Sequence, residues 1–327
     1  MRALVTGAAG FVGQWLCGEL LRRGWEVTGA RLERDAFGLP GAPSRSAALS
    51  AEEGAAVRWL ACDVTRPDDI IRSLDNSRPD AIFHLAGVSF LPQAGADPGA
   101  ALEVNAVAAA RLLSAVRTRK RAGELDPVVL IVGSGEQYGA HPREEQPLSE
   151  GAEQRPINVY AASKAAQEVV SLEAFRSDGV RVIATRSFNH SGAGQSARFV
   201  IPALVRRALA LHASGGRVLS LGNISPVRDF LHVVDVVSAY ILLAVHGVPG
   251  EVYNVSSGQG VDIGTLAERI LALAGADATL EVDPSLVRPV DVPVLIGSAA
   301  RLRAATGWKA ERSLDTIIED VIRAAPR

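Results

Sequence analysis

Continuous apolar runs alternate with helical patterns along the first half of the chain. The runs predict strands over 2–7, 26–31, 57–64, 80–87, 128–135 and 180–188. Apolar residues at helical spacing predict helices over 11–24, 67–79, 100–121 and 159–179. Strands that are apolar throughout, rather than at every second position, are typical of a parallel sheet covered by helices on both faces. We therefore predict an α/β fold with a doubly wound parallel sheet.

The alternation loosens after about residue 187, where glycine and proline become frequent and the helical patterns shorter. This change predicts a large domain over 1–187 and a smaller C-terminal α/β domain over 188–327. We also expect the chain to return to the large domain near 227–247. The segment 35–55, which is rich in Gly, Pro, Ala and Ser, is interpreted as a loop.

Three glycines, Gly7, Gly10 and Gly13, lie between the first strand and the first helix. Gly7 permits a tight turn, Gly10 lets the backbone approach a pyrophosphate, and Gly13 lets the helix pack close to the sheet. Phe11 and Val12 then lie at the helix N-terminus, where free N–H groups and the helix dipole attract phosphates. This strand–turn–helix predicts a dinucleotide site in a Rossmann-type domain.

The spacing G-x-x-G-x-x-G resembles that of the short-chain dehydrogenase/reductase family. The resemblance implies that Asp63 and Val64, after the third strand, lie at the adenine, and that Leu85 and Ala86 line the nicotinamide side. Members that use NAD carry an acidic residue at the end of the second strand, where this chain has Arg31. Because Arg can pair with a 2′-phosphate that an acid would repel, NADP(H) is favoured and NAD(H) is the alternative.

The stretch "YAASK" places Tyr160 and Lys164 one helical turn apart on one face. A neighbouring ammonium is expected to lower the pKa of Tyr160 toward working pH. The family resemblance implies that Ser134 binds the substrate carbonyl, Tyr160 passes the proton, and Lys164 holds the cofactor ribose. By the same resemblance, Glu136 is a further catalytic candidate and Asn105 a structural asparagine.

Four later stretches resemble the extended, nucleotide-sugar branch of this family: "RSFNHSGAGQSARFVIPALV", "GNISPVRDFLHVVDVV", "VYNVSSGQGVDI" and "VRPVDVPVLIGSAARLRAATGW". They are most similar to reductases of GDP-linked 4-keto-6-deoxy sugars. The resemblance implies a substrate domain in which Asn189, Arg228 and Arg288 hold the diphosphate of a GDP-sugar, for which Arg offers a planar bidentate fork. The implied reaction is hydride transfer from NADPH to the C4 ketone of GDP-4-keto-6-deoxy-mannose, giving GDP-rhamnose.

Three alternatives stay open. A GDP-mannose 4,6-dehydratase needs acid and base groups after the catalytic serine, where Gly135 offers none, and Glu136 is shared with the reductases. A C4 epimerase on another nucleotide sugar would use the same fold. Redox-sensing binding proteins of this fold usually lose the Tyr–Lys pair, which this chain keeps.

The composition and charge of the chain limit which classes of binding partner are expected. A net charge of -2 over 327 residues gives no reason to expect nucleic acid or an anionic membrane. The longest apolar stretch, around 239–248, is too short to span a bilayer, and no signal peptide is expected.

Cys17 and Cys62 are expected as buried free thiols of a cytoplasmic protein. No metal site is predicted. Resemblance implies a homodimer that pairs through the helices at about 100–121 and 157–177.

Overall fold

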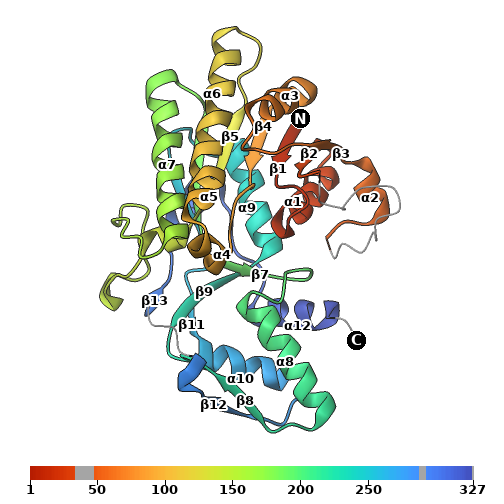
Figure 1. Ribbon diagram of the computed structural model, residues 1–327, viewed down its shortest axis with the longest axis vertical. Helices are drawn as coiled ribbons and strands as arrows, with labels where there is room; N and C mark the ends of the chain where they lie inside the picture. The colour runs from red at the N-terminus through yellow and green to blue at the C-terminus, as the bar shows by residue number, and fades with distance from the viewer. Residues whose placement is uncertain (34–47, 287–291, 326–327) are drawn as a thin grey trace.

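A parallel sheet of seven strands forms the upper part of the molecule in Figure 1. The computed structural model describes residues 1–33, 48–286 and 292–325. In spatial order the strands are β10 (Val252–Val255), β6 (Val182–Ser187), β5 (Val128–Ser134), β4 (Ala81–His84), β1 (Arg2–Thr6), β2 (Glu26–Arg31) and β3 (Arg58–Ala61). The chain order reverses at β1, and ligand sites of such sheets lie at the carboxyl ends of the strands beside that point. The predicted doubly wound parallel sheet is confirmed.

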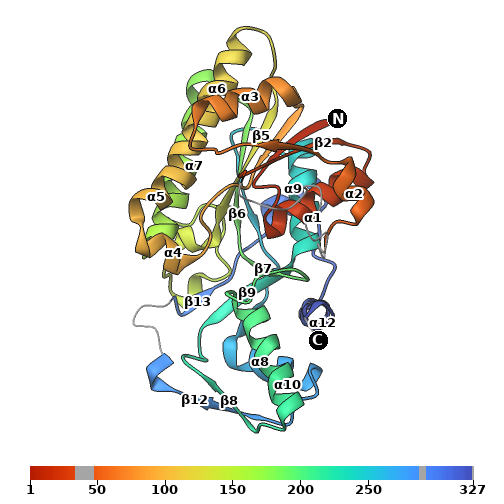
Figure 2. The same cartoon turned by 45° about the vertical axis from the view of Figure 1, so that its right-hand side comes forward.

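Helices cover both faces of this sheet (Figure 2). One face carries α3 (Pro67–Ser77), α6 (Ala108–Arg121) and α7 (Val159–Asp178), and the other carries α1 (Phe11–Arg22), α9 (Val233–His246) and α11 (Ala300–Thr306). An apolar core lies on each face of the sheet, and successive residues of β1 point into one core and then the other. Ala3 and Val5 pack on the side of α1 and α9, and Leu4 packs on the side of α3 and α6. Burial on both faces is the reason why the strands are apolar throughout.

The lower part of the molecule contains two small sheets with helices packed beside them (Figure 1). One sheet contains β7 (Asn189–Ser191), β9 (Val227–His232), β11 (Gly260–Asp262) and β13 (Val294–Leu295), and the other pairs β8 (Val218–Leu221) with β12 (Thr279–Val282). Their apolar side chains share a core with α8 (Val200–Ser214), α10 (Ile263–Leu273) and α12 (Leu314–Ala324).

The segment 227–247, expected to return to the large domain, is divided between the two parts. Its strand β9 belongs to the lower sheet, whereas α9 covers the large sheet, and the chain re-enters that sheet only at β10. The division of the chain at residue 187 stays a prediction about domains.

In the described part of the chain before residue 100, the short helices α2 (Ala51–Ala56) and α4 (Leu91–Ala96) were not predicted. In the expected loop 35–55, α2 begins at Ser50, whose hydroxyl accepts from the Glu53 N–H while the Glu53 carboxylate accepts from the Ser50 N–H. The loop prediction is therefore wrong over 51–55, because the S-x-x-E capping box starts a helix there. Residues 35–47 lie outside the described residues.

The predicted helix 100–121 consists of α5 (Pro98–Leu102), a π-helical turn η1 (Glu103–Val107) and α6. In the described part of the chain, this stretch is the helix that is long and apolar enough to cross a membrane. From the sequence, the longest apolar stretch was expected around 239–248, most of which lies in α9, and it was expected to be too short to span a bilayer. Leu112, Leu113 and Val116 are buried in the core that α6 shares with α3, as in a core helix of a globular domain.

Cys17 and Cys62 are both buried and unbridged, as predicted. Burial raises the pKa of the Cys17 thiol to about 12, so this thiol stays protonated at neutral pH. Among the described residues, no group of three or more His, Cys, Asp or Glu side chains could hold a metal ion.

Candidate active site

The glycine turn between β1 and α1 brings the helix N-terminus close to the sheet. Gly7 has φ +70°, and a Cβ there would lie 2.8 Å from the backbone nitrogen of Ala86. A Cβ on Gly13 would overlap the Gly7 carbonyl oxygen, so only glycine lets α1 start this close to the sheet. Gly10 is the N-cap of α1, which no side chain caps. The N–H groups at Phe11 and Val12 therefore have no capping side chain and can bind an anion.

The predicted adenine-side residues lie at the carboxyl edges of β2 and β3. Arg31 ends β2 in register with Ala61, and its buried side chain donates to the Leu32 carbonyl oxygen over 3.3 Å. Asp63 follows β3, and its Oδ1 accepts from the backbone and the hydroxyl of Thr65 at 3.0 and 2.7 Å. Next to Asp63, Val64 is buried. Arg31 and Asp63 therefore lie at the carboxyl ends of adjacent strands, where the sequence predicts the ribose and adenine.

Leu85 and Ala86 follow β4 beside the glycine turn. Each donates its N–H to Thr6, Leu85 to the carbonyl oxygen and Ala86 to the hydroxyl, both over 3.3 Å. The same hydroxyl lies 2.9 Å from Nδ1 of His84. The strand ends of β1 and β4 are thereby held together where the nicotinamide half is expected.

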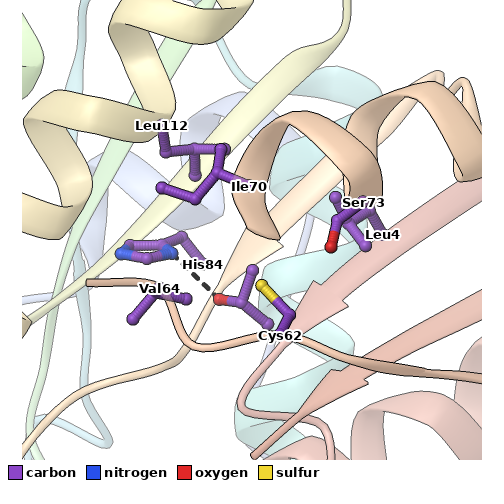
Figure 3. A pocket seen from close by; sticks show the side chains of 8 residues that line it. Leu4, Cys62, Val64, Ile70, Ser73, His84 and Leu112 are labelled. Carbon is purple, nitrogen blue, oxygen red and sulfur yellow. Dashed lines mark hydrogen bonds between the residues drawn. The ribbon is translucent and has the colours of Figure 1, made fainter. Parts of the chain in front are cut away.

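Figure 3 shows a cavity behind this edge, between β1, β4, α3 and α6. Its volume of about 10 Å³ holds roughly one water molecule. Its lining is Leu4, Thr6, Cys62, Val64, Ile70, Ser73, His84 and Leu112. Burial and the charge of Lys164 lower the pKa of His84 to about 3, so this ring is neutral at physiological pH.

Ser134, Tyr160 and Lys164 come together from β5 and α7. Tyr160 is partly buried, and burial raises its pKa to about 12, opposed by a side-chain hydrogen bond with Ser134, while the charge of Glu136 raises it further. Ser134 Oγ accepts from the Glu136 N–H at 3.2 Å, which leaves the Ser134 proton free to donate.

Lys164 is buried, and burial lowers its pKa to about 8. Its Nζ donates to the Val132 carbonyl oxygen at 2.8 Å and to Gln167 Oε1 at 3.0 Å. The sequence predicted that Lys164 lowers the pKa of Tyr160. Among the described residues, Ser134 and Glu136 affect this pKa, and Lys164 does not. The ammonium is instead directed to the end of β5.

Asn105 ties three elements together at this site. Fully buried in η1, it donates to the Val88 carbonyl oxygen at 3.1 Å and to Ser163 Oγ at 2.8 Å, and it accepts from the Val88 N–H at 2.8 Å. The π-helical turn, the segment after β4 and the helix that carries Tyr160 are thus fixed to one another.

The expected diphosphate residues lie on neighbouring strands of the lower sheet. Asn189 pairs with Phe230 in the β7–β9 register, and Arg228 lies two residues before Phe230 on the same strand. Arg228 Nη1 donates to the carbonyl oxygens of Val227 at 2.9 Å and Val292 at 2.7 Å. Arg288 lies outside the described residues.

Two features of the site were not found from the sequence. The first is Asp229, a fully buried carboxylate that accepts from Ser257 N and Oγ at 2.9 and 2.6 Å, from Gly258 N at 2.9 Å and from Gly297 N at 3.3 Å. Burial raises its pKa, while these bonds oppose the shift. An acid directly before the apolar pair Phe230 and Leu231 of β9 was the available signal, since a buried carboxylate needs several donors.

The second feature is the aromatic wall beside Ser134. A Cβ on Gly135 would lie 3.1 Å from the ring of Phe188, and a Cβ on Gly297 would overlap the same ring from another side. Phe188 itself is 2% exposed. The ring therefore crowds the place of a side chain at position 135 and would have to move by a few tenths of an ångström to admit one. Nothing local in the sequence indicates this packing, because the three residues are far apart in the chain.

Comparison with known proteins agrees with this arrangement. The family model described as GDP-mannose 4,6 dehydratase matches residues 4–321. GDP-6-deoxy-D-mannose reductase of Pseudomonas aeruginosa is 37% identical over 263 residues, which cover 79% of this chain and 85% of that protein. GDP-6-deoxy-D-talose 4-dehydrogenase of Aggregatibacter actinomycetemcomitans is 28% identical and covers 92% of this chain and 90% of its own.

Among solved structures, RMD from Pseudomonas aeruginosa in complex with NADPH superposes with a TM-score of 0.80 at 31% identity. The match covers 99% of this chain and 98% of that one. The match of the family model to nearly the whole chain, together with the sheet and the Ser–Tyr–Lys arrangement, shows that the chain is an enzyme of the extended short-chain dehydrogenase/reductase type and belongs to the GDP-mannose 4,6-dehydratase family.

Proposed function

We propose that the protein is a reductase that transfers hydride from NADPH to the C4 ketone of GDP-4-keto-6-deoxy-mannose and gives GDP-rhamnose. The observation that carries the proposal is the packing beside Ser134, where Gly135 has no side chain and the buried Phe188 ring lies 3.1 Å from the place of its missing Cβ, so that position 135 offers no proton donor. The likeness to the reductase of Pseudomonas aeruginosa, over 79% of this chain, supports the same choice.

The cofactor site fits NADPH at its two ends. The uncapped N-terminus of α1, which follows the tight turn at Gly7, would receive the pyrophosphate. Arg31, at the end of β2, would pair with the 2′-phosphate, and Asp63 and Val64 would lie at the adenine. NADPH is also the cofactor in the solved structure of RMD, and NAD(H) stays the alternative.

The protein groups supply the proton and hold the ketone. Bound NADPH supplies the hydride. Ser134 donates a hydrogen bond to the C4 oxygen, and Tyr160, whose pKa of about 12 keeps it protonated, gives its proton to the same oxygen. Lys164, with a pKa of about 8, is mostly charged at pH 7 and would hold the ribose hydroxyls.

The substrate is held from the lower sheet. Asn189 and Arg228 lie on β7 and β9, on adjacent strands, where they would bind the diphosphate together with Arg288. Asp229 fixes the turn at Ser257 and Gly258 next to Arg228. A GDP-sugar bound there would direct its hexose toward Ser134 and Tyr160.

The alternatives are a GDP-mannose 4,6-dehydratase and a C4 epimerase on another nucleotide sugar. Elimination of water across C5 and C6 needs an acid and a base besides Tyr160. Glu136 could act as one of them, but Gly135 has no side chain and Phe188 occupies the space beside it. This difference favours the reductase.

We also propose a cytoplasmic homodimer with no nucleic-acid or membrane partner. The pairing would involve α6 and α7, near which Leu102, Val107, Ile157 and Val169 are exposed. The stretch Pro98–Arg121 has the composition of a membrane span but is partly buried in the core.

The test of the function is a stoichiometry. Purified protein is incubated with NADPH and GDP-4-keto-6-deoxy-mannose, and cofactor oxidation is compared with product formed. We expect a one-to-one ratio and a rate at least about 100-fold lower for Tyr160→Phe, the scale of positioned acid catalysis. GDP-mannose alone should give little or no keto sugar. Conversion of GDP-mannose with no net cofactor change would establish the dehydratase instead.

A further inference from the structure

The backbone of Ser134 is bound by the side chain of Gln137, to which the mechanism assigns no role. The Ser134 N–H donates to Gln137 Oε1 at 2.7 Å, and both residues are buried, Gln137 fully. This bond and the bond from the Glu136 N–H to Ser134 Oγ together cap the N-terminus of the short 3₁₀ helix η2 (Gly135–Tyr138). The oxygen of one amide therefore fixes the backbone that presents the Ser134 hydroxyl.

The nitrogen of the same amide is bound to the helix that carries the other two groups. Gln137 Nε2 donates to Glu168 Oε2 at 3.0 Å. Glu168 lies on α7, one turn beyond Lys164 and two turns beyond Tyr160, on the same face. The amide thus bridges the end of β5 to α7 at the level of the site.

The carboxylate that receives this bond cannot turn freely. Both of its oxygens bind Arg186, with distances of 2.9 Å from Nε and 2.7 Å from Nη2, and the two side chains are 5% and 6% exposed. The Arg186 guanidinium also lies 4.7 Å above the ring of Tyr138. A bidentate buried pair of this kind fixes orientation as well as position.

We propose that Gln137 is a positioning residue that sets the separation of Ser134 and Tyr160 by bridging η2 to Glu168 on α7. The inference rests on the proposed reductase function. A second link between the same elements is the bond from Lys164 Nζ to the Val132 carbonyl oxygen. That link uses the Lys164 side chain, which is also needed at the ribose, whereas the mechanism gives no role to the side chains of Gln137 and Glu168.

Only an amide satisfies both ends of this bridge. The Ser134 N–H requires an acceptor and the Glu168 carboxylate requires a donor, and a glutamine offers both on one side chain. An apolar residue at 137 would leave the buried Ser134 N–H without its partner. Misplacement of a reacting group by about 1 Å can cost 100-fold in rate, so loss of the bridge should appear mainly in kcat.

The test compares Gln137→Leu with Gln154→Leu. Gln154 belongs to the same network, since it donates to Glu168 Oε1 at 2.6 Å and accepts from Gln137 Nε2 at 3.2 Å, but it is not bonded to Ser134. We expect kcat to fall about tenfold or more in Gln137→Leu alone, with little change in NADPH affinity or substrate KM. Equal losses of kcat in the two variants would overturn the inference and make the network merely structural.

A second variant keeps the test decisive if Gln137→Leu does not fold. In Gln137→Met, the side chain has nearly the length of glutamine and fills the same buried space, but it offers neither the acceptor for the Ser134 N–H nor the donor to Glu168. The ion pair between Glu168 and Arg186 is left in place. We expect kcat to fall about tenfold in this variant as well, with little change in NADPH affinity or substrate KM. A Gln137→Met variant with the wild-type kcat would contradict the bridge.

A readout without substrate separates this inference from the proposed function. The chain has four tyrosines, so ¹³C labelling at Cζ gives four resonances, and Tyr160→Phe identifies one of them. In the NADP⁺-loaded protein, Gln137→Leu should shift the Tyr160 resonance, because its hydrogen bond with Ser134 changes, and Gln154→Leu should not. If the wild-type enzyme does not reduce the sugar, the function fails, but an unmoved Tyr160 resonance is what would refute the bridge.

Discussion

Single residues at the site are set for proton donation. Burial keeps the Tyr160 phenol protonated, with a pKa of about 12, and lowers the pKa of Lys164 to about 8. At neutral pH the site therefore presents a neutral phenol next to the Ser134 hydroxyl, which suits reduction of a ketone. The deprotonated phenol that would oxidise an alcohol requires further stabilisation, and bound ligands that move Lys164 away from Val132 would supply it.

At this scale the first prediction concerns Gly135. In Gly135→Ser the new Cβ would lie 3.1 Å from the Phe188 ring, so the ring must move by a few tenths of an ångström against Gly297. We expect a loss of about 1–3 kcal/mol in the free energy of unfolding from overpacking, measured by urea denaturation. The variant should still not convert GDP-mannose, because a serine forced against an aromatic ring does not supply a placed acid.

The control for Gly135→Ser is the double variant Gly135→Ser/Phe188→Leu. A smaller side chain at 188 relieves the contact, so the two changes together should cost about 1 kcal/mol less than the sum of the single changes. Strict additivity would show that Phe188 does not fill the space beside Ser134.

At the scale of elements, helix α1 joins the two halves of the site. Phe11 at its start stacks on His190, with ring centroids 6.4 Å apart and planes 8° apart. One turn later, Trp15 Nε1 donates to the Ala193 carbonyl oxygen at 3.2 Å. The helix whose N-terminus would bind the pyrophosphate thus also holds the segment that follows Asn189.

Trp15→Phe should therefore weaken substrate binding more than cofactor binding. Phenylalanine removes the indole N–H and can keep the edge contact that Trp15 makes with His232. We expect KM for the GDP-sugar to rise several-fold, roughly the value of one hydrogen bond, with the NADPH affinity and kcat nearly unchanged. Steady-state kinetics and NADPH fluorescence titration measure these quantities.

Trp308→Phe is the matched control, because its indole N–H also donates to a backbone carbonyl, that of Asp235, at 3.0 Å. It should lower stability without raising KM. A similar KM for Trp15→Phe and the wild type would show that α1 does not position the 189–193 segment.

Elements made by neighbouring residues were predictable, and contacts between distant ones were not. The strand–turn–helix at Gly7, Gly10 and Gly13 follows from local spacing, and the structure has it. The capping box at Ser50 was equally local, but the Gly- and Pro-rich composition around it hid α2. The packing of Phe188 over Gly135 depends on the fold, because no short-range pattern joins residues about 50 positions apart.

The same limit applied to the polar network of the site. Ser134, Tyr160 and Lys164 could be named from motifs, whereas the bridge from Gln137 to Glu168 joins two residues that carry no motif of their own. The contact of Lys164 with Val132 could not be predicted from the sequence either. A lysine side chain has several rotamers, and the packing of the surrounding atoms determines which one it adopts.

For the molecule as a whole, acid should destabilise the fold partly through one buried ring. His84 is fully buried beneath the site, with its Nδ1 at 2.9 Å from Thr6 Oγ1 and with Nε2 lacking a partner among the described residues. Burial, aided by the charge of Lys164, lowers its pKa to about 3. The folded protein therefore keeps this histidine neutral over a range in which the unfolded chain protonates it.

The sign of the effect follows from that depressed pKa. Well above pH 6.5 neither state protonates His84, so its contribution to stability is complete, and as pH falls through 6.5 toward 3 only the unfolded chain takes up the proton. Between pH 7 and 5 this one group should remove about 2 kcal/mol from the free energy of unfolding. In His84→Asn, which cannot titrate there, the loss over the same interval should be smaller by about that amount, as measured by urea denaturation at each pH.

Thr6→Val is the control: it removes the hydroxyl partner but keeps the buried ring, so it should lower stability at pH 7 and retain the wild-type pH dependence. If His84→Asn and the wild type lose stability in parallel, the neutral buried His84 is not a source of the acid sensitivity.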